Sequence, residues 1–352
     1  MRVTINDVAK HAGISVRTVS RVLNDHPNVS DFTRARVLEA MKELDFGPNA
    51  LARGLARQES YTIGVLIPDV ANPYFAEVVR GIEDVSAQAR YHIFLCNTDE
   101  YPEQESRSIR LLRQRQVDGL ILVSPRLDEH AAARIFANDR RVVVVNRAWS
   151  HLGITSVVVS NRDKGREAAD ILASTEPKCL AYLSGPANSE SSELRWIGFR
   201  ERALELQMEP VRIDSSHRIP SIQKGHEAMG KLLSMTSSSV GVFSFNDLMA
   251  IGALDSIREH DLKVPQDLRL VGFDDIAMAS RLHPALTTFH IPKLQVGNAA
   301  MHCLLEILKQ GDESDPREVV ISPEAIVRDS TRNSVYSAPS IIWSHGNQSG
   351  GG

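Results

Sequence analysis

The sequence has few of the features that mark secreted, membrane-bound or metal-stabilised proteins. It contains three cysteines, Cys96, Cys179 and Cys303, whose wide spacing fits neither a disulfide framework nor a zinc site, so we expect buried, unreactive thiols. No apolar run is long enough to span a membrane, and the opening MRVTIND lacks the apolar core of a signal peptide. These absences predict a cytoplasmic protein without a metal site.

The motifs of common enzymes are missing as well. The segment GHEAMGK, residues 225–231, has the spacing of a phosphate-binding loop, but Leu232 replaces the Ser or Thr that would hold magnesium, and the segment lies within a helical pattern. No G-x-G-x-x-G opens a helix after the first expected strand, and HExxH and Gly-x-Ser-x-Gly do not occur. The sequence therefore predicts no catalytic residue, no cofactor and no enzyme activity.

At 352 residues the chain is long enough for two or more folding units. Charge is distributed unevenly along it. Residues 1–60 hold nine Lys or Arg against seven Asp or Glu, a net charge of +2, whereas the remainder has a net charge of −6. Phosphate repels an acidic body unless a local basic element overcomes the repulsion. We therefore expect only the N-terminal part to touch DNA, and two copies of it to act together.

Two short helical patterns joined at Gly13 occupy residues 5–24. Gly13 can take the positive φ of a tight turn between helices. The second helix begins at Ser15, a natural N-cap, and carries Arg17 and Arg21 one turn apart on its outer face. A plain helical hairpin is the alternative, but a helix-turn-helix module that reads DNA is favoured because the apolar residues match its core positions: Val8, Ala9, Ala12, Ile14, Val19 and Val22.

A third helix and a short hinge are expected next. Ser30 or Asp31 can cap the helix, in which apolar residues repeat at helical spacing. Gly47 and Pro48 then break it, and residues 49–57 form a helix-prone stretch too short to be stable in water until something binds it. The third helix would close the small core with Val37, Leu38, Met41 and Leu44.

The run from Thr4 to Leu55, with TVSRVLN at its centre and PNALARGL at its end, resembles the headpiece and hinge of the lactose repressor family (LacI/GalR type). In that family two hinge helices fold together in the operator minor groove, and a leucine from each enters the central base step. The resemblance gives this role to Leu55, with Ala52 beside it. A linker residue packed on the headpiece is the alternative for Leu55.

The same resemblance implies roles for residues of the headpiece. Val16 and Arg17 would face base edges, and Arg21 would read a guanine through a bidentate contact. Val16 departs from the polar or aromatic residue of some members, because valine can meet a thymine methyl but cannot donate a hydrogen bond. Short polar side chains would hold phosphates and fix the register: Thr4, Ser15, Asn24, Ser30 and Thr33.

From Tyr61 onward, strands rich in Val, Ile and Leu alternate with helical patterns. Two series of such units predict two doubly wound lobes with parallel sheets, so that the fold class is an all-α helix-turn-helix headpiece plus an α/β two-lobed body like that of periplasmic binding proteins. The strands read TIGVLIPD, HIFLCN, GLILVS and RVVVVN in the first series, then SVVVSN, CLAYLSG, VGVFSFN and LRLVGFDD in the second.

Polar and aromatic residues follow these strands, where ligands of such folds bind. Carboxylates, carboxamides and an arginine can bracket sugar hydroxyls while aromatic rings stack on the sugar ring. For Asn72 and Asn246 a helix-capping role is an equal alternative. The expected cleft residues are Asp69, Asn72, Tyr74, Phe75, Ser124, Asn146, Arg195, Asn246 with Asp247, and Asp274 with Asp275.

The family resemblance extends to about residue 331 and ranks these residues. The segments GPANSESSELRWIGFR, FNDLMAIGAL and VPQDLRLVGFDD favour Arg195, Asn246 and Asp274 as effector contacts, with His217 as a pocket-lining ring, while PALTTFHIPK returns the chain to the first lobe. The implied domains are residues 1–47, a hinge at 48–60, lobe one at about 61–160 and 291–321, lobe two at about 161–290 and 322–332, and a tail at 333–352.

These observations predict a cytoplasmic, nucleoid-associated transcriptional repressor whose affinity for palindromic operator DNA changes when a small effector, a sugar or sugar derivative, binds between the lobes. A palindrome requires a homodimer, and the C-terminal SVYSAPSIIWSHGNQSGGG has no leucine heptad that would form tetramers. The alternatives are a periplasmic-type sugar-binding protein without a regulatory role, and a regulator controlled by a nucleobase or a phosphoprotein corepressor.

Overall fold

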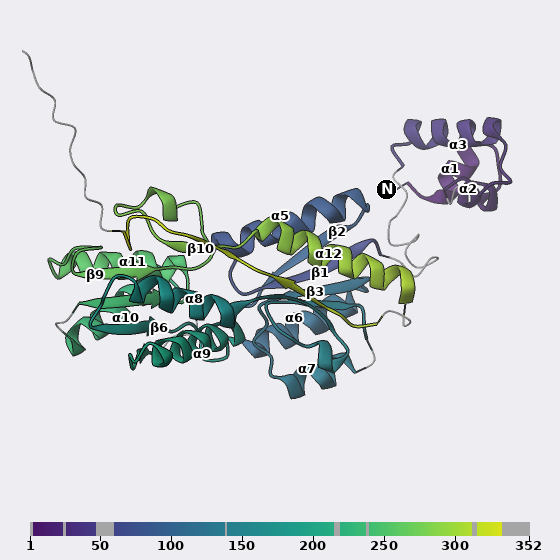
Figure 1. The fold of residues 1–352 in the computed structure, drawn as a ribbon. Coiled ribbons are helices and arrows are strands. Elements are labelled where there is room, and N and C mark those ends of the chain that lie inside the picture. Colours follow the sequence, from purple (N-terminus) through teal and green to yellow (C-terminus); the bar gives the residue numbers. More distant parts are fainter. Residues whose placement is uncertain are drawn as a thin grey trace, which may run out of the picture.

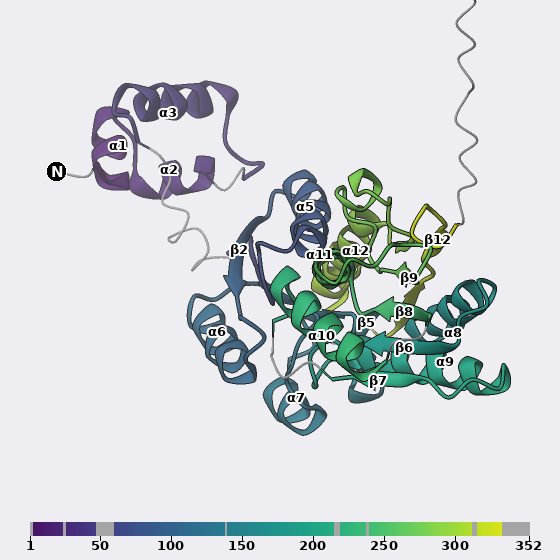
Figure 2. The same ribbon diagram turned by 90° about the vertical axis from the view of Figure 1, so that its left-hand side faces the viewer.

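The computed structural model describes residues 3–23, 26–46, 60–137, 139–214, 219–236, 239–311 and 315–332. Within them, a small helical headpiece and a larger two-lobed α/β body are seen, and both views draw the two apart (Figures 1 and 2). The predicted hinge helix and tail lie outside the described residues, as do four of the predicted site residues: Asn24, Ala52, Leu55 and His217.

The headpiece forms its own core from three helices, α1 (Ile5–His11), α2 (Val16–Leu23) and α3 (Asp31–Glu43). Val8, Val19 and Val37, one from each helix, are fully buried against one another. Gly13 adopts a φ of +63° between α1 and α2, a conformation that glycine takes without a Cβ clash. The predicted helix-turn-helix core is confirmed.

The third helix differs from its prediction at one position. Ser30 caps α3 as expected, its hydroxyl accepting a hydrogen bond from the Thr33 N–H at 3.3 Å. Val37 and Ala40 fill the core, whereas the side chain of Leu38 is 53% exposed. The expectation that Leu38 closes the core is wrong, because it lies about 100° around the helix from Val37 and the two helices beneath α3 cover only one stripe.

Lobe one is built on a sheet of six parallel strands in the order β11-β5-β4-β3-β1-β2. Helices α5 (Pro73–Gln88) and α12 (Lys293–Gln310) cover one face, and α6 (Pro102–Gln114) and α7 (Glu129–Phe136) cover the other (Figure 1). The strands are β1 (Thr62–Ile67), β2 (His92–Asn97), β3 (Gly119–Val123), β4 (Val142–Val145), β5 (Thr155–Val159) and β11 (Glu318–Ile321), and a 3-10 turn, η1 (Ser150–Leu152), follows β4.

Strand β2 is the edge of this sheet, which corrects the prediction that HIFLCN is a buried strand. Phe94 and Leu95 are 51% and 41% exposed, because β2 pairs only with β1 and helix α5 covers it partially. The central strands β3 and β4 are buried throughout, as expected for parallel strands with helices on both faces. The strand SVVVSN also belongs to this sheet, as β5, rather than to the second series.

Lobe two has a second parallel sheet in the order β7-β6-β8-β9. Helices α8 (Asn161–Ala173) and α9 (Glu190–Glu205) pack as one pair against it, and α10 (Ile222–Met235) and α11 (Asp247–Glu259) as another (Figure 2). Two doubly wound parallel sheets are thus present, as predicted. The strands are β6 (Cys179–Leu183), β7 (Val211–Ile213), β8 (Val240–Ser244) and β9 (Leu268–Val271), and η2 (Ala279–Arg281) is a 3-10 turn.

Two short antiparallel strands join the lobes. Strand β10 (Thr288–His290) lies in the predicted return segment PALTTFHIPK and leads into α12, which packs along α5 in lobe one. Strand β12 (Glu324–Ile326) pairs with β10 and carries the chain back after β11, as Figure 1 shows in yellow. The lobes are therefore connected at one side, and the loops after their sheets face each other.

Paired glycines let the long helices approach closely. Gly165 on α8 and Gly198 on α9 face each other's helix, and a Cβ at Gly198 would stand 1.9 Å from the Arg162 carbonyl oxygen. Gly81 with Gly297, and Gly225 with Gly252, do the same for α5 with α12 and α10 with α11.

No helix in the described ranges is both long and apolar enough to cross a bilayer.

We expect Gly198→Ala to lower the free energy of unfolding by about 1–3 kcal/mol, because the added methyl group must push α9 away from α8. Differential scanning calorimetry should record this as a fall in Tm of about 3–10 °C. Gly230→Ala is the matched control, since its Cβ would meet only Ser256 Oγ at 3.6 Å. A Tm for Gly198→Ala at or above that of the control would contradict this account of the packing.

Candidate functional site

The first candidate surface is the outer face of α2 in the headpiece. Val16, Arg17 and Arg21 are all exposed there. Four of the predicted short polar residues, Thr4, Ser15, Ser30 and Thr33, lie at helix starts. The Ser15 hydroxyl accepts a hydrogen bond from the Thr18 N–H at 3.1 Å, and the Thr4 N–H and hydroxyl donate to the Asp7 carboxylate. Helix starts present free N–H groups that favour phosphate. This face combines two guanidiniums with one apolar side chain.

The second candidate is a partly open cavity of about 30 Å³ between the two lobes. Residues from both lobes line it, which fits the expectation that ligand-binding side chains follow parallel strands. The cavity brings together eight of the twelve predicted cleft residues: Asn72, Tyr74, Phe75, Ser124, Asn146, Arg195, Asn246 and Asp274.

On the side of lobe one, three of these residues form a hydrogen-bonded group. The Asn146 side-chain amide donates to Tyr74 Oη at 2.9 Å and to Ser124 Oγ at 2.8 Å. Ser124 and Asn146 each end a strand with a positive φ, +51° and +61°, which turns both side chains toward the same point. Burial raises the pKa of Tyr74, so its hydroxyl stays neutral and offers both a donor and an acceptor.

The two asparagines cap helices and also lie at the cavity, so the capping alternative is confirmed and the effector contact stays a prediction. Asn72 Oδ1 accepts from the Tyr74 N–H at 3.0 Å and starts α5, and Asn246 Oδ1 accepts from the Met249 N–H at 3.0 Å and starts α11. Both residues also line the cavity. Helix capping therefore fixes the positions of two cavity side chains.

On the side of lobe two, Arg195 is the central cation. Its Nε donates to Asn161 Oδ1 at 2.8 Å, its Nη1 donates to the Phe245 carbonyl, and its guanidinium lies 3.4 Å from the centroid of the Phe273 ring. Burial lowers the pKa of Arg195, and the Asp274 carboxylate opposes that shift. The side chain is held rigidly with its charge beside the cavity.

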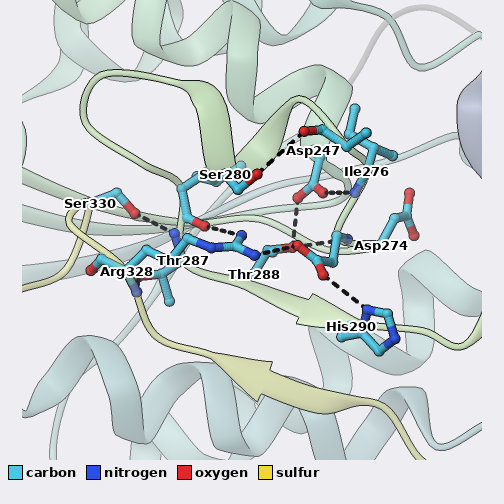
Figure 3. Close-up of polar contacts among 12 residues, drawn as sticks. Asp247, Asp274, Ile276, Ser280, Thr287, Thr288, His290, Arg328 and Ser330 are labelled. Atoms are coloured by element: carbon cyan, nitrogen blue, oxygen red, sulfur yellow. Dashed lines mark hydrogen bonds and ion pairs between the residues drawn. The ribbon is translucent and has the colours of Figure 1, made fainter.

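The loop that carries Asp274 is strained and anchored from two directions. Asp274 and Asp275 have φ values of +110° and +52°, a conformation that costs about 1–3 kcal/mol per residue unless the surroundings enforce it. The buried ammonium of Lys293, at the start of α12, donates to both of their carbonyl oxygens at 2.9 Å. Asp247 accepts from the Ile276 N–H at 2.9 Å and from Thr288 Oγ1 at 2.7 Å (Figure 3). The anchors come from both lobes.

Three predicted carboxylates do not line the cavity. Asp247 serves the anchoring role just described. Asp275 forms ion pairs with Arg328 at 2.7 Å and with His290 of β10 at 2.9 Å. Asp69 Oδ1 accepts a hydrogen bond from the Ala71 N–H at 2.9 Å. Aspartate side chains commonly form this kind of turn with the backbone N–H two residues later.

The cavity also contains residues that the sequence analysis did not select. Glu100 and Arg126 form an ion pair with both side chains almost fully buried, and each lines the cavity. Arg126 lies three residues after β3, so the strand-end rule, that ligand-binding side chains follow parallel strands, could have predicted it. No pattern in the neighbouring sequence predicts that Glu100, in the turn after β2, lines the cavity. The remaining unselected lining residues are Ser189, Ser191, Pro220 and Phe245.

The buried carboxylates predict a pH-dependent stability. Burial, reinforced for Asp247 by the charge of Asp274, raises the pKa of Asp247 to about 8 and that of Asp274 to about 7. A raised folded-state pKa means that the folded protein holds the proton more tightly than the unfolded chain, so this stability is fully present below about pH 4 and is lost progressively as the pH rises to about 7 for Asp274 and about 8 for Asp247. We expect the Tm to fall between pH 5.5 and 8.5.

Asp247→Asn should flatten this slope by up to about 1.4 kcal/mol per pH unit, the effect of one released proton. Asp255→Asn, on the outer side of the same helix, is the control and should keep the wild-type slope. Thermal unfolding at several pH values measures both. Identical slopes in the two variants would show that Asp247 does not titrate in this range.

A helix-turn-helix module joined to a two-lobed body with a polar cavity between the lobes defines a ligand-binding transcriptional regulator. Comparison with known proteins agrees. The family described as bacterial regulatory proteins, lacI family, matches residues 4–49, and a periplasmic binding protein-like domain matches residues 176–331. The chain belongs to the lacI family, as its sequence indicated, and is a DNA-binding transcriptional regulator rather than an enzyme.

Relatives match over almost the whole length. The HTH-type transcriptional regulator RegA of Clostridium saccharobutylicum is 34% identical over 336 residues, covering 94% of this chain and all of that protein. Catabolite control protein A of Priestia megaterium is 33% identical over 337 residues, covering 94% of this chain and all of that protein. The family assignment therefore applies to headpiece and body together.

Solved structures agree with the fold. The lac repressor dimer bound to operator and the anti-inducer ONPF has a TM-score of 0.83 and 27% identity, covering 94% of this chain and 99% of that one. A LacI family transcriptional regulator from Enterococcus faecalis with bound ribose has a TM-score of 0.68 and 28% identity, covering 77% of this chain and 98% of that one.

In the described part of this chain, no three His, Cys, Asp or Glu side chains lie close enough together to hold a metal ion.

Proposed function

We propose that this regulator is a repressor whose affinity for a palindromic operator changes when a sugar or sugar derivative binds between the lobes. The observation that carries the proposal is the cavity itself, since eight side chains chosen for sugar chemistry line it from both lobes. A ligand that touches both lobes favours one angle between them and so acts on the whole body.

Sugar chemistry is supported by the types of group in the cavity. Asp274 and Arg195 provide an acceptor and donors for neighbouring hydroxyls, the amides of Asn72 and Asn246 add both kinds, and the ring of Phe75 offers a face for the apolar side of a sugar. The ribose bound to the Enterococcus faecalis regulator is a sugar on a similar body. These features favour a sugar over a nucleobase or a phosphoprotein as the controlling ligand.

Coupling to DNA is proposed to run through the anchored loop. A ligand held by Asp274 acts on a loop whose carbonyl oxygens are bonded to Lys293 of α12. Helix α12 packs closely against α5 in lobe one, where a Cβ at Gly297 would stand 2.1 Å from the Val78 carbonyl oxygen. A change at Asp274 therefore has a short, rigid route to the lobe that receives the headpiece.

On the DNA side, Val16, Arg17 and Arg21 are proposed to face base edges, with Arg21 on a guanine. Phosphate contacts are proposed for Thr4, Ser15, Ser30 and Thr33, and minor-groove contacts for Leu55 and Ala52. Asn24 would complete the phosphate contacts. The exposed arginines of α2 are the structural support for this part of the proposal.

A homodimer is proposed because a palindrome needs two headpieces. Its support in the body is on lobe one, where Phe94 of β2 and Leu111 of α6 are 51% and 49% exposed. Large apolar side chains left exposed are candidates for contact with a second copy of the chain. We propose that such a dimer acts in the cytoplasm, where it binds the DNA of the nucleoid.

Binding-site selection from a random DNA pool, followed by gel-shift assays in about 150 mM salt, tests the proposal. The expected result is a palindromic site that binds with nanomolar affinity and whose affinity changes at least tenfold when one member of a sugar panel is added. A site that binds equally well with every sugar would reject the effector role, and no selected site would reject operator recognition by the isolated protein.

A further inference from the structure

A larger pocket shares Arg126 with the interlobe cavity, and its other lining residues come from the first turns of α6 and α7, from the segments after β3 and β4, and from Asn188 before α9. It has a volume of about 420 Å³, against about 30 Å³ for the inner cavity. Pockets that hold small ligands usually measure about 300–1,000 Å³. The outer pocket is therefore large enough to hold part of a ligand, whereas the inner cavity is narrow in this arrangement of the lobes.

Arg126 joins the two spaces. Its side chain lines both the outer pocket and the inner cavity, and its partner Glu100 lines the inner one. The backbone N–H groups of Arg126 and Leu127 donate to the buried Glu105 carboxylate at 2.7 and 2.9 Å, which fixes this wall. A ligand that passes along the Arg126 side chain would occupy both spaces at once.

The outer pocket touches both lobes. Arg147, which follows β4 in lobe one, forms an ion pair with Glu190 of α9 at 3.2 Å and donates to the Asn188 carbonyl oxygen at 3.3 Å. Arg147 and Asn188 both line the pocket. A ligand bound there would contact the same interlobe junction that Arg147 holds together.

The charges that line the outer pocket are balanced. Arg126 and Arg147 provide guanidinium donors, and Glu103 and Asp128 provide carboxylate acceptors. An anionic ligand would meet two carboxylates together with arginines that already have carboxylate partners in Glu100 and Glu190. A neutral ligand with many hydroxyl groups can use donors and acceptors of both kinds.

We propose that the effector is a neutral sugar of at least two units, with one unit in the inner cavity, which must widen by a movement of the lobes to admit it, and a second unit in the outer pocket beyond Arg126. This inference rests on the proposed function, since it names the class of sugar that the interlobe site accepts. The second unit contacts lobe one at Glu103 and Asp128 and lobe two at Asn188.

The test uses the full-length protein and isothermal titration calorimetry. The probes are D-glucose, D-galactose, D-fructose and D-ribose, the disaccharides cellobiose, maltose, lactose, sucrose and trehalose, and glucose 6-phosphate. We expect one disaccharide to bind at least about tenfold more tightly than either of its own sugar units, as two or three extra hydrogen bonds would produce.

Ala131→Trp, on α7, fills the outer pocket and should remove this advantage while leaving any monosaccharide affinity unchanged. Ser106→Trp fills the same pocket from α6 and keeps the test valid if one variant does not fold. Ala133→Trp is the matched control, because Ala133 is exposed on the same helix and does not line the pocket, and it should bind like the wild type.

The outcomes separate this inference from the proposed function. A monosaccharide that binds as tightly as every disaccharide, in the wild type and in Ala131→Trp, would overturn the second subsite and leave a sugar effector intact. Tighter binding of glucose 6-phosphate than of any neutral sugar would overturn the neutral class. If no probe binds, both the two-unit effector and the proposed sugar response fail.

Discussion

Arg21→Ala is expected to weaken operator binding by about 30-fold to 20,000-fold. A bidentate contact from arginine to guanine contributes about 1–3 kcal/mol of discrimination, and a dimer on a palindrome makes the contact twice. Arg21 lies exposed in the last turn of α2, one turn after the exposed Arg17, while Val19 and Val22 on the opposite face are buried. The substitution therefore removes a contact without disturbing the headpiece core.

The measurement compares affinities for the selected operator and for operators changed at single base pairs. Arg21→Ala should lose discrimination at one base pair in each half-site, whereas loss of a phosphate contact weakens all sequences alike. Arg36→Ala is the matched control, since Arg36 is an exposed arginine of the same headpiece on α3. An equal loss of affinity on every sequence would place Arg21 on the DNA backbone instead of a base.

The parts of the molecule that sequence predicted well are those governed by local rules. The positive φ at Gly13, the cap at Ser30 and the apolar stripe of Val8, Val19 and Val37 each depend on residues within a few positions of one another. The strand-end rule is also local, and it was sufficient to collect eight cavity residues from two lobes, because all parallel strands of a sheet end at one edge.

The parts that sequence missed depend on which elements become neighbours. Leu38 fits a helical repeat but lies where nothing covers it, and Phe94 reads as a core residue although β2 is an edge strand. The contacts of Gly165 with Gly198 require knowledge of which two helices cross. The same holds for Lys293, whose partners Asp274 and Asp275 are almost twenty residues away in sequence and belong to the other lobe.

The site also contains two kinds of residue, those whose side chains line the cavity and those that fix the positions of the lining residues. Asn246 and Asp247 are neighbours at the start of α11, yet Asn246 lines the cavity and Asp247 anchors the loop of Asp274 from behind. The sequence places both residues at a strand end and cannot tell which of them lines the cavity, because that depends on the folded position of the loop at residues 274–276. One predicted ligand contact, Asp247, therefore proves to be a residue that positions the loop.

Asp274→Asn is expected to abolish the response to the effector while operator binding stays within about threefold of wild type. Asp274 is 6% exposed, lines the cavity and faces the Arg195 guanidinium, so it is the carboxylate best placed to accept hydrogen bonds from a ligand. Losing a carboxylate acceptor in a buried site costs about 1.5–3 kcal/mol, a fall in ligand affinity of about 10-fold to 150-fold, measured at pH 8, where the Asp274 carboxyl is ionised. The loop itself should stay in place, because Lys293 holds its backbone and not the Asp274 side chain.

Asp69→Asn gives the matched comparison, since it makes the same change at a nearby strand-end carboxylate that turns away from the cavity and can still accept from the Ala71 N–H. Ligand affinity by calorimetry and operator affinity by gel shift, measured on both variants, separate the roles. Only Asp274→Asn should lose the ligand, because only its carboxylate reaches the cavity, and both should bind the operator. Equal ligand affinity in the two variants would remove Asp274 from the site, and loss of operator binding in Asp274→Asn would mean that its carboxylate supports the DNA-binding conformation of the body instead of reading the ligand.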